Sequence, residues 1–457
     1  MAASVTPHGR GLLQSSQDKG EIAMHPTRGR LSRRQWLQGT LGTSAAIAAP
    51  QVIPAMALGG DGRSPPSERI AVGFLGVGGH GLHRNLGMFL QQPDAQPVAL
   101  CDADGRQLPV ALRMVQQKFG PSYRCQLTRD FREVIARSDV DAVMISTPDH
   151  WHVPMSVAAI RAGKDVICEK PTLTIAEGRL LANTVRRYGA VFQLSTEDRS
   201  LAVYHRMAEL VRNERIGKLR RIIVGLPTGP SHVADPTPQP VPKELDYEMW
   251  LGPAPWAPYC PARLPFNWRW VSDYSGGMLT DWGAHLLDTA QWANNTERTG
   301  PIEVWGTGKR PPGGLYDTFY EFHLHYTYAN GVHMEVHSGG VRLRFEGTDG
   351  WIESTGWIGP LTASSPEILR TTIGPNEVHL FTCPEGEHRN FLDCVKTRRD
   401  PYFPAEVGHR CCSVAHLGNI ALALGRKLRW DPHAEQFPHD PEANRFLCRA
   451  MREPWCL

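Results

Sequence analysis

The stretch Arg69-Ile-Ala-Val-Gly-Phe-Leu-Gly-Val-Gly-Gly-His-Gly81 decides the fold of the N-terminal half of this chain. Residues 70–75 are a short apolar run typical of a buried parallel strand. The pattern Gly76-x-Gly78-x-x-Gly81 follows at once, with Gly79 inside it, and a helical pattern comes next. Such glycines allow a tight turn, a close approach of the backbone to a pyrophosphate, and close helix–strand packing. The helix N-terminus adds free N–H groups for phosphate.

A carboxylate follows at the position that dinucleotide-binding sheets use for ribose. Residues 97–102 read as the second strand, and Asp102 ends it, about 20 residues past the last glycine. A carboxylate there accepts the ribose hydroxyls of NAD and repels the 2′-phosphate of NADP. The sequence therefore predicts NAD as the cofactor, with NADP kept as the alternative because Arg106 is nearby.

The rest of the N-terminal half alternates between strands and helices. This alternation predicts right-handed crossovers and a parallel, doubly wound Rossmann domain over residues 58–195. Ligands of such sheets bind outside the carboxyl ends of the strands. We expect these strand ends to place further residues beside the glycine turn: Thr147, Pro148, His150, Glu169 and Lys170.

The first 57 residues resemble an export signal. Ser32-Arg-Arg-Gln-Trp-Leu37 is a twin-arginine pattern, residues 41–52 are mildly apolar, and Ala55-Met-Ala57 suits a signal peptidase. The apolar run is too short to span a membrane stably. We therefore predict a periplasmic protein that is free of the membrane once the signal is removed. The first methionine and Met24 both remain as possible starts.

Charge and cysteine usage exclude several classes of protein. The chain has 49 Lys and Arg against 46 Asp and Glu, and the basic excess lies in residues 1–57, so the remainder carries no electrostatic footprint for nucleic acid. The spacing of the 10 cysteines fits neither a disulfide framework nor a zinc site. His150-x-His152 and His323-x-His325 could bind a metal, but alternate strand positions share a face, so we predict no metal site.

The second half has a different pattern, which predicts an α+β domain over residues 196–457 with a large, mostly antiparallel, open sheet. Alternating runs at 319–327 and 332–337 flank Ala329-Asn-Gly331, a strong hairpin signal. Residues 341–345 and 351–353 continue the alternation. We expect one sheet face to stay open and partly apolar, and to pair copies of the chain into a homodimer or homotetramer.

A second informative stretch is Gly276-Gly-Met-Leu-Thr-Asp-Trp-Gly-Ala-His-Leu-Leu-Asp288. On a helix, Asp281, His285 and Asp288 share one face. Asp281 could orient His285, which could take a hydroxyl proton at neutral pH. The alternative is a solvated polar stripe without chemistry.

Together these features resemble the glucose-fructose oxidoreductase / inositol dehydrogenase / rhizopine-catabolism (Gfo/Idh/MocA) family, in its exported twin-arginine branch. The resemblance runs from about Ile70 to the C-terminus and rests on the glycine turn, Thr147-Pro148-x-His150, Glu169-Lys170-Pro171 and Asp281-x-x-x-His285-x-x-Asp288.

The resemblance implies roles for individual residues. Lys170 lies beside the nicotinamide and binds the reacting hydroxyl, His285 is the base, Asp281 supports it, and Asp288 binds the substrate. The chain departs from the branch at Leu286 and in the turn Ser195-Thr-Glu-Asp-Arg199. Both departures fall near the expected substrate pocket, in which we also place Arg199. The sugar preference of relatives therefore cannot be transferred to this chain.

Three functions follow from these observations. The first is an NAD-dependent oxidoreductase acting on a sugar, sugar derivative or cyclitol. The second is a glycosidase that uses bound NAD for transient oxidation and elimination. The third is a binding protein that keeps the fold without catalysis, which the presence of both Lys170 and His285 disfavours.

Overall fold

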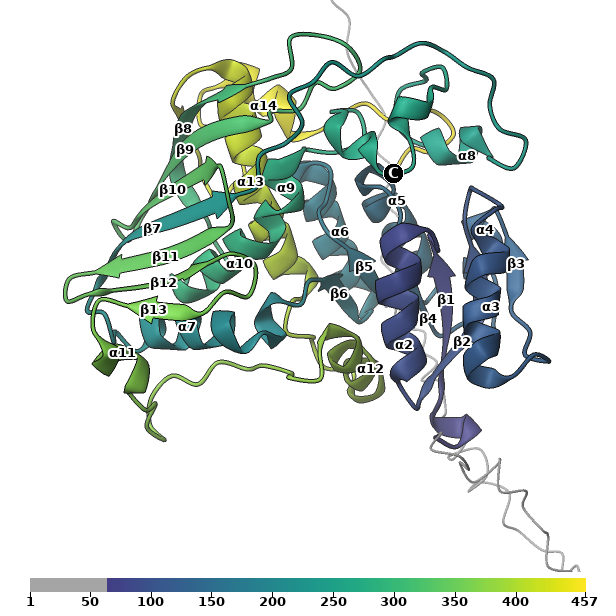
Figure 1. The fold of residues 1–457 in the computed structure, drawn as a ribbon, viewed down its shortest axis with the longest axis horizontal. Coiled ribbons are helices and arrows are strands. Elements are labelled where there is room, and N and C mark those ends of the chain that lie inside the picture. Colours follow the sequence, from purple (N-terminus) through teal and green to yellow (C-terminus); the bar gives the residue numbers. More distant parts are fainter. Residues whose placement is uncertain (1–63) are drawn as a thin grey trace, which may run out of the picture. The chain divides into compact units, whose positions relative to one another are not determined.

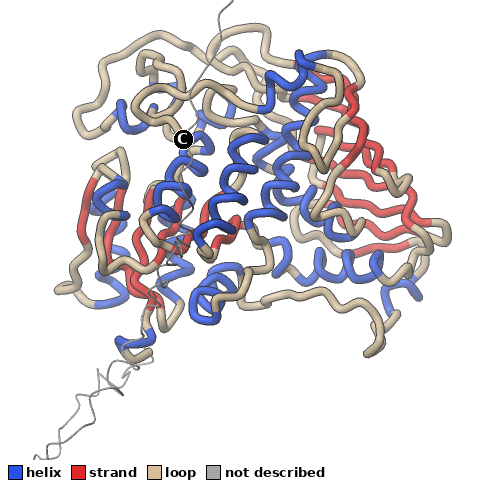
Figure 2. The backbone as a smooth tube through the Cα atoms, turned by 180° about the vertical axis from the view of Figure 1, so that it is seen from behind, coloured by secondary structure: helices blue, strands red, loops and turns tan. Residues whose placement is uncertain are grey.

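A computed structural model of the chain describes residues 64–457 (Figures 1 and 2). The predicted export signal, with its twin arginines, lies outside the described residues. Two sheets organise the described part, and a group of helices lies between them (Figure 1). Among these residues, no helix combines the length and apolar character that crossing a bilayer requires.

The first sheet is six-stranded and parallel, in the order β3-β2-β1-β4-β5-β6. This order reverses between β1 and β4, where ligands bind in doubly wound sheets. Its strands are β1 (Ile70–Leu75), β2 (Ala95–Cys101), β3 (Gln126–Thr128), β4 (Ala142–Ile145), β5 (Asp165–Glu169) and β6 (Phe192–Ser195).

Helices cover both faces of this sheet, as the sequence predicted. In β1, Val72 and Phe74 point into one apolar core and Leu75 points into the other. The helices on the first side are η3 (Gly81–Leu86), which has π-helical geometry, α2 (Gly87–Gln91), α3 (Leu108–Phe119) and α12 (Glu387–Thr397). Those on the second side are α4 (Phe131–Ile135), α5 (Asp149–Arg161) and α6 (Ile175–Tyr188).

The second sheet is eight-stranded and mixed, in the order β13-β12-β11-β7-β10-β9-β8-β14. Only the β10–β7 pair is parallel, so the predicted mostly antiparallel sheet is confirmed. The strands are β7 (Leu219–Leu226), β8 (Pro301–Lys309), β9 (Glu321–Tyr328), β10 (His333–Ser338), β11 (Arg342–Gly347), β12 (Trp351–Thr355), β13 (Leu361–Ala363) and β14 (Leu428–Arg429).

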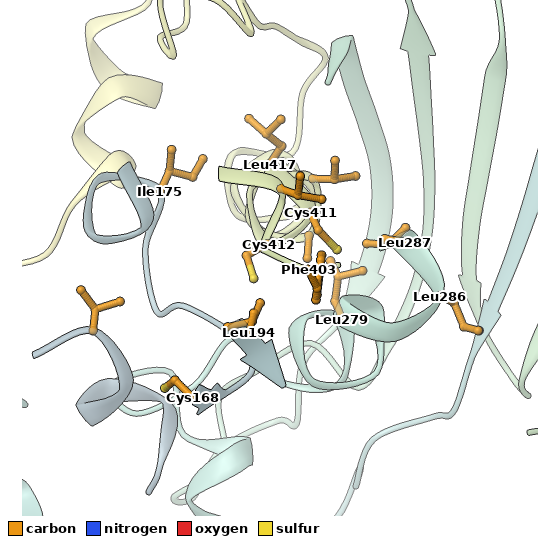
Figure 3. Close-up of a cluster of buried hydrophobic side chains, with 14 of the residues drawn as sticks. Cys168, Ile175, Leu194, Leu279, Leu286, Leu287, Phe403, Cys411, Cys412 and Leu417 are labelled. Carbon is orange, nitrogen blue, oxygen red and sulfur yellow. The ribbon is translucent and has the colours of Figure 1, made fainter. Parts of the chain in front are cut away.

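One face of the second sheet packs on helices that separate it from the first sheet. These are α7 (Ala202–Arg212), α10 (Gly283–Ala293) and α13 (Ala405–Leu424). Figure 3 shows Cys411, Cys412 and Leu417 of α13 in the apolar cluster that also contains Leu194 of β6 and Leu279. All ten cysteines are free thiols, and seven of them are buried. The remaining helices are α8 (Tyr247–Leu251), α9 (Met278–Asp281), α11 (Pro366–Arg370) and α14 (Pro441–Asn444).

The open face of the second sheet differs from the expectation. It is polar where we expected a partly apolar surface: Glu321, His323 and His325 alternate along β9 with the buried Phe322 and Leu324. Neighbouring strands add ion pairs to the same face, such as Arg221 with Glu335. This face is therefore more polar than we expected, although Trp305 lies beside His325 on it.

Candidate active site

A cleft of about 1050 Å³ opens at the carboxyl ends of the parallel strands. The first sheet contributes the glycine turn and the ends of β2, β4 and β5, while α9, α10 and the loop after β12 contribute the opposite side. Most of the predicted site residues line this cleft: Gly76, Gly78, Gly79, Asp102, Thr147, Pro148, Glu169, Lys170, Asp281 and His285. Gly81, His150, Arg199 and Asp288 are not among the lining residues.

The glycine turn has the positive φ angle and the close contacts that its pattern predicts. Gly76 has φ +86°, and a Cβ there would lie 2.6 Å from the Ser146 carbonyl oxygen. A Cβ on Gly81 would lie 2.3 Å from the Gly76 oxygen, so this glycine serves helix–strand packing. A Cβ on Gly78 would clear the protein, with its nearest neighbours at 3.6 Å. The protein itself does not require glycine at position 78, which fits a turn kept open for a phosphate.

Asp102 closes the glycine turn from the end of β2. Its Oδ2 accepts the Val77 N–H at 2.9 Å, and its Oδ1 accepts the Asp104 N–H at 2.9 Å. Burial raises the pKa of Asp102 to about 6, although the backbone hydrogen bonds oppose the rise. Each carboxylate oxygen keeps a lone pair for a further donor. Arg106 was the reason for keeping NADP as the alternative cofactor. Its guanidinium donates two hydrogen bonds to Asp104, of 2.7 and 2.8 Å.

The strand ends of β4 and β5 complete the cofactor side. The Thr147 hydroxyl is buried and has no hydrogen-bond partner within residues 64–457, so it is free for a ligand group. Glu169 accepts from Asn85 at 2.9 Å and lies 3.1 Å from His80, which ties β5 to the helix after the glycine turn. The glycine cradle, the Asp102 carboxylate and the unpartnered hydroxyl together fit a dinucleotide.

His150 lies behind this rim. Its ring is 1% exposed, and its Nε2 is 2.9 Å from the Trp250 carbonyl oxygen. Burial lowers the pKa of His150 to about 3, so the ring is neutral. The neighbouring His152 lines the cleft and lies 2.8 Å from both the Thr147 and Pro171 carbonyl oxygens. The structure thus places His150 as a support of the rim and does not bring it into the cleft.

Lys170 and Asp281 form an ion pair across the cleft. The Lys170 ammonium donates to Asp281 Oδ1 and to the Asp281 carbonyl oxygen, each at 2.7 Å. Burial alone would lower the pKa of Lys170, but Asp281 and Glu169 outweigh it and raise that pKa. Lys170 and Arg269 lower the pKa of Asp281 to about 2 against the effect of burial. Lys170 is therefore a cationic donor and not a neutral base.

His285 has a different carboxylate partner from the one we expected. Its Nδ1 lies 2.8 Å from Asp198 Oδ2, and the Asp198 side chain is 0% exposed. Burial would lower the pKa of His285, yet the Asp198 charge outweighs it and raises that pKa. Asp281, the predicted partner, is held by Lys170, which reaches it from the end of β5. The backbone at Trp282, between α9 and α10, keeps helical angles (φ −81°, ψ −27°), so the different partners come from the neighbouring segments and not from a kink.

Asp198, the carboxylate partner of His285, was not singled out by the sequence analysis. It lies in the turn Ser195-Thr-Glu-Asp-Arg199, directly after β6. The rule that places Glu169 at the rim applies equally to a residue after β6. The position of Asp198 after a parallel strand could therefore have identified it. The helical spacing instead pointed to Asp281, the carboxylate that is nearer to His285 in the sequence.

The predicted substrate residues Arg199 and Asp288 form a buried ion pair outside the cleft. Arg199 donates to both Asp288 oxygens at 2.7 and 2.8 Å, and their side chains are 6% and 0% exposed. Glu297 adds a third charge, 2.8 Å from Arg199. This geometry differs from the expectation: the two residues join α10 to the turn after β6 and do not line the cleft.

Aromatic side chains form the outer wall of the cleft. Trp357, from the loop after β12, packs edge-on against His285 at 5.2 Å and against Trp282 at 5.4 Å. Trp250, Tyr259, Phe266 and Trp268 line the wall on the other side. The sequence analysis did not single out this wall, whose members come from the segment 250–268, from Trp282 and from Trp357 in the loop after β12. Aromatic faces of this kind cover the apolar face of a small organic ligand.

Comparison with known families agrees with this geometry. A model described as "Oxidoreductase family, NAD-binding Rossmann fold" matches residues 70–196, and "Oxidoreductase family, C-terminal alpha/beta domain" matches residues 230–457. The chain belongs to the Gfo/Idh/MocA oxidoreductase family. Its N-terminal domain is accordingly an NAD-binding Rossmann domain, and the match extends over both halves of the chain.

Curated relatives are similar to this Gfo/Idh/MocA chain over about a quarter of its length. "Glycosyl hydrolase family 109 protein 1" of Shewanella sp. (strain ANA-3) is 32% identical over 127 residues, which are 27% of this chain and 28% of the relative. "Alpha-N-acetylgalactosaminidase" of Shewanella oneidensis is 31% identical over the same shares. The chain therefore matches less than a third of the length of these relatives.

Solved structures share the fold at low identity. The aldose-aldose oxidoreductase from Caulobacter crescentus, complexed with glycerol, superposes with a TM-score of 0.59 at 19% identity, covering 79% of this chain and 99% of that one. The WlbA dehydrogenase from Bordetella pertussis, in complex with NADH and UDP-GlcNAcA, gives 0.59 at 14% identity, covering 79% and 99%. These similarities show the Gfo/Idh/MocA fold of the chain.

Proposed function

We propose that this protein is an NAD-dependent oxidoreductase that acts on a hydroxyl of a sugar, sugar derivative or cyclitol. The observation that carries the proposal is that the glycine turn, Lys170 and His285 line one cleft, although they come from different parts of the chain. Bound NAD would supply the hydride acceptor. The protein must then position the hydroxyl and remove its proton.

Two charge pairs supply these tasks. Lys170, held cationic by Asp281, donates a hydrogen bond to the substrate oxygen and stabilises the negative charge that develops there. His285, oriented by Asp198 through Nδ1, presents Nε2 to take the hydroxyl proton. Asp198 stabilises the imidazolium that results. The aromatic wall at Trp282 and Trp357 restricts water beside His285.

A screen for substrates tests this function. Purified protein is mixed with sugars and cyclitols, with and without NAD, and scored first by thermal shift and then by NADH absorbance. We expect a subset of polyhydroxylated compounds to raise the melting temperature more strongly with NAD, and some to yield NADH. Binding of such compounds without any dependence on NAD, and without NADH, would contradict the proposal.

The glycosidase remains the second candidate because of the Shewanella relatives named as glycosyl hydrolases. A glycosidase that oxidises transiently returns the hydride, so it would release the aglycone without net NADH. Chromogenic glycosides, α-N-acetylgalactosaminides among them, separate the two functions. Aglycone release that requires NAD but accumulates no NADH would favour the second.

The preference for NAD over NADP is part of the same proposal. Asp102 supports it, because its carboxylate would face the 2′-phosphate of NADP, and Arg106 is already neutralised by Asp104. Replacing Asp102 with Ala should weaken NAD binding and reduce discrimination against NADP. Tighter binding of NADP than of NAD by the unmodified protein would overturn this preference.

We further propose export to the periplasm and assembly into a homodimer or homotetramer. The twin arginines support export, and Arg33→Lys with Arg34→Lys should keep the precursor in the cytoplasm. Because the open sheet face carries charges, an assembly through it should weaken with salt. Light scattering at low and high salt tests this, and a monomer under both conditions would contradict it.

A further inference from the structure

A histidine cluster lies on the open face of the second sheet, away from the cleft. β9 contributes His323 and His325, and β10 contributes His333 and His337. Alternate residues of a strand share a face, so each pair points the same way. In the antiparallel register His325 lies opposite Glu335. The two strands therefore gather imidazoles and one carboxylate on a single surface.

Three of these side chains converge closely enough to share an ion. His325 Nδ1 and His333 Nε2 are 3.3 Å apart, and a Glu335 oxygen lies within 4.8 Å of both nitrogens. Zinc–nitrogen bonds of about 2.0–2.1 Å in a tetrahedron place two ligand nitrogens about 3.3–3.4 Å apart. The two imidazoles, which share a hydrogen bond in the metal-free protein, are already at this separation.

We propose that His325, His333 and Glu335 form a site for a divalent transition metal ion, with zinc as the reference ion. Two imidazoles and a carboxylate are ligands that zinc accepts, and water or His323 would complete four-coordination. All three ligands belong to one chain. None of them lines the cleft, so the site does not depend on the proposed oxidoreductase function.

The surroundings orient the three ligands. Arg221 donates to Glu335 Oε2 at 2.7 Å and to Oε1 at 3.2 Å, and each oxygen keeps a lone pair for a metal. The Trp305 ring stacks on His325, with centroids 5.3 Å apart and planes at 18°.

Zinc binding to the purified protein tests the proposal. The protein is stripped with a chelator, titrated with zinc chloride by calorimetry, and analysed for metal after desalting. We expect one tightly held zinc per chain. The double variant His325→Asn/His333→Asn should weaken zinc binding by more than the roughly 100-fold that loss of an outer-shell partner can cost.

Matched controls separate this site from other histidines. His433 and His439 are exposed and lie outside the cluster, so His433→Asn/His439→Asn removes the same number of imidazoles and should leave binding unchanged. Glu335→Gln, which preserves shape, should weaken zinc binding while the melting temperature of the metal-free protein stays near that of the unmodified chain. The Glu335→Gln variant therefore still tests the site if the His325→Asn/His333→Asn variant does not fold.

Three outcomes would overturn the site. The first is an unmodified protein that retains no zinc, and the second is a His325→Asn/His333→Asn variant that binds zinc as tightly as the unmodified chain. The third concerns His285, which with Glu197 and Asp198 also places ligand atoms within 4.8 Å of one another beside the cleft. If His285→Ala removes the zinc and the strand variant does not, the ion belongs to the cleft.

Discussion

Two charge clusters lie back to back on the same two segments of the chain, and they differ in what they face. Asp198 pairs with His285 at the cleft, and the next residue, Arg199, pairs with Asp288 in the interior. His285 and Asp288 are both on α10, nearly one turn apart. In the first pair, His285 Nε2 is left for a ligand in the cleft. In the second pair, the Arg199 guanidinium and both Asp288 oxygens bind each other.

The difference shows that residue type and spacing do not decide chemical role. Asp281, His285 and Asp288 form a regular polar stripe in the sequence, yet each has a different partner: Lys170, Asp198 and Arg199 respectively. Because all three are buried or nearly so, the alternative of a solvated stripe is excluded. Asp281 and His285 of this stripe thus line the cleft, whereas Asp288 belongs to the interior. Four predictions test this division.

The largest effect should come from the interior pair. Arg199→Met removes the cation that holds the fully buried Asp288 and should cost about 3–5 kcal/mol of unfolding free energy, as breaking buried pairs does. The double variant Arg199→Met/Asp288→Leu removes both charges and should recover most of that loss. Urea denaturation measures both. If the single variant were as stable as the unmodified chain, the pair would not be structural.

Next in size is the cleft base. His285→Ala should lower turnover about 10²–10⁴-fold, which is the usual contribution of a positioned general base. NAD affinity should change little, because the ring does not face the glycine turn, whereas the free energy of unfolding should fall, because the buried Asp198 loses its imidazole partner. Steady-state rates on a substrate from the screen, with NAD titration as the control, measure this. Turnover close to that of the unmodified protein would give the ring no chemical role.

Asp281→Asn should cost less turnover than His285→Ala, because it removes support for Lys170 and not the proton acceptor. The Asp281 charge is what outweighs burial at Lys170, so its loss should lower the pKa of Lys170. Activity should then decline at a lower alkaline pH than in the unmodified enzyme, as the ammonium loses its proton. The pH profile of kcat/KM measures the shift, and an unmoved alkaline limb would contradict the pairing.

The smallest effect is a shift of the acid limb. His285 must be neutral to accept a proton, and the Asp198 charge raises its pKa above the ordinary value of about 6.5. Oxidation should therefore increase with pH through this raised pKa. Asp198→Asn should move the limb to lower pH and modestly reduce the plateau. If Asp281→Asn moved the acid limb and Asp198→Asn did not, Asp281 would be the partner of His285.

Local patterns predicted the parts of the fold that depend on local physics. The glycine turn, the alternation of strands and helices, and the Asn-Gly hairpin each predicted the element that the structure contains. The nine-residue strand β8 was missed because Gly306 and Gly308 interrupt its pattern. A Cβ on Gly306 would lie 2.3 Å from the His323 carbonyl oxygen, so contact with β9 requires glycine there. That requirement comes from a neighbouring strand and is not visible in the segment itself.

The sequence by itself determined the parallel Rossmann sheet, its cofactor turn and the rim that carries Lys170, because the alternation of strands and helices and the carboxyl-end rule depend on short-range patterns. Only the tertiary structure decided which carboxylate serves which cation. Lys170 reaches Asp281 from the end of β5, and the turn after β6 brings Asp198 to His285. Charge pairing depends on distances between segments that are separated by more than 80 residues, and no local pattern encodes those distances.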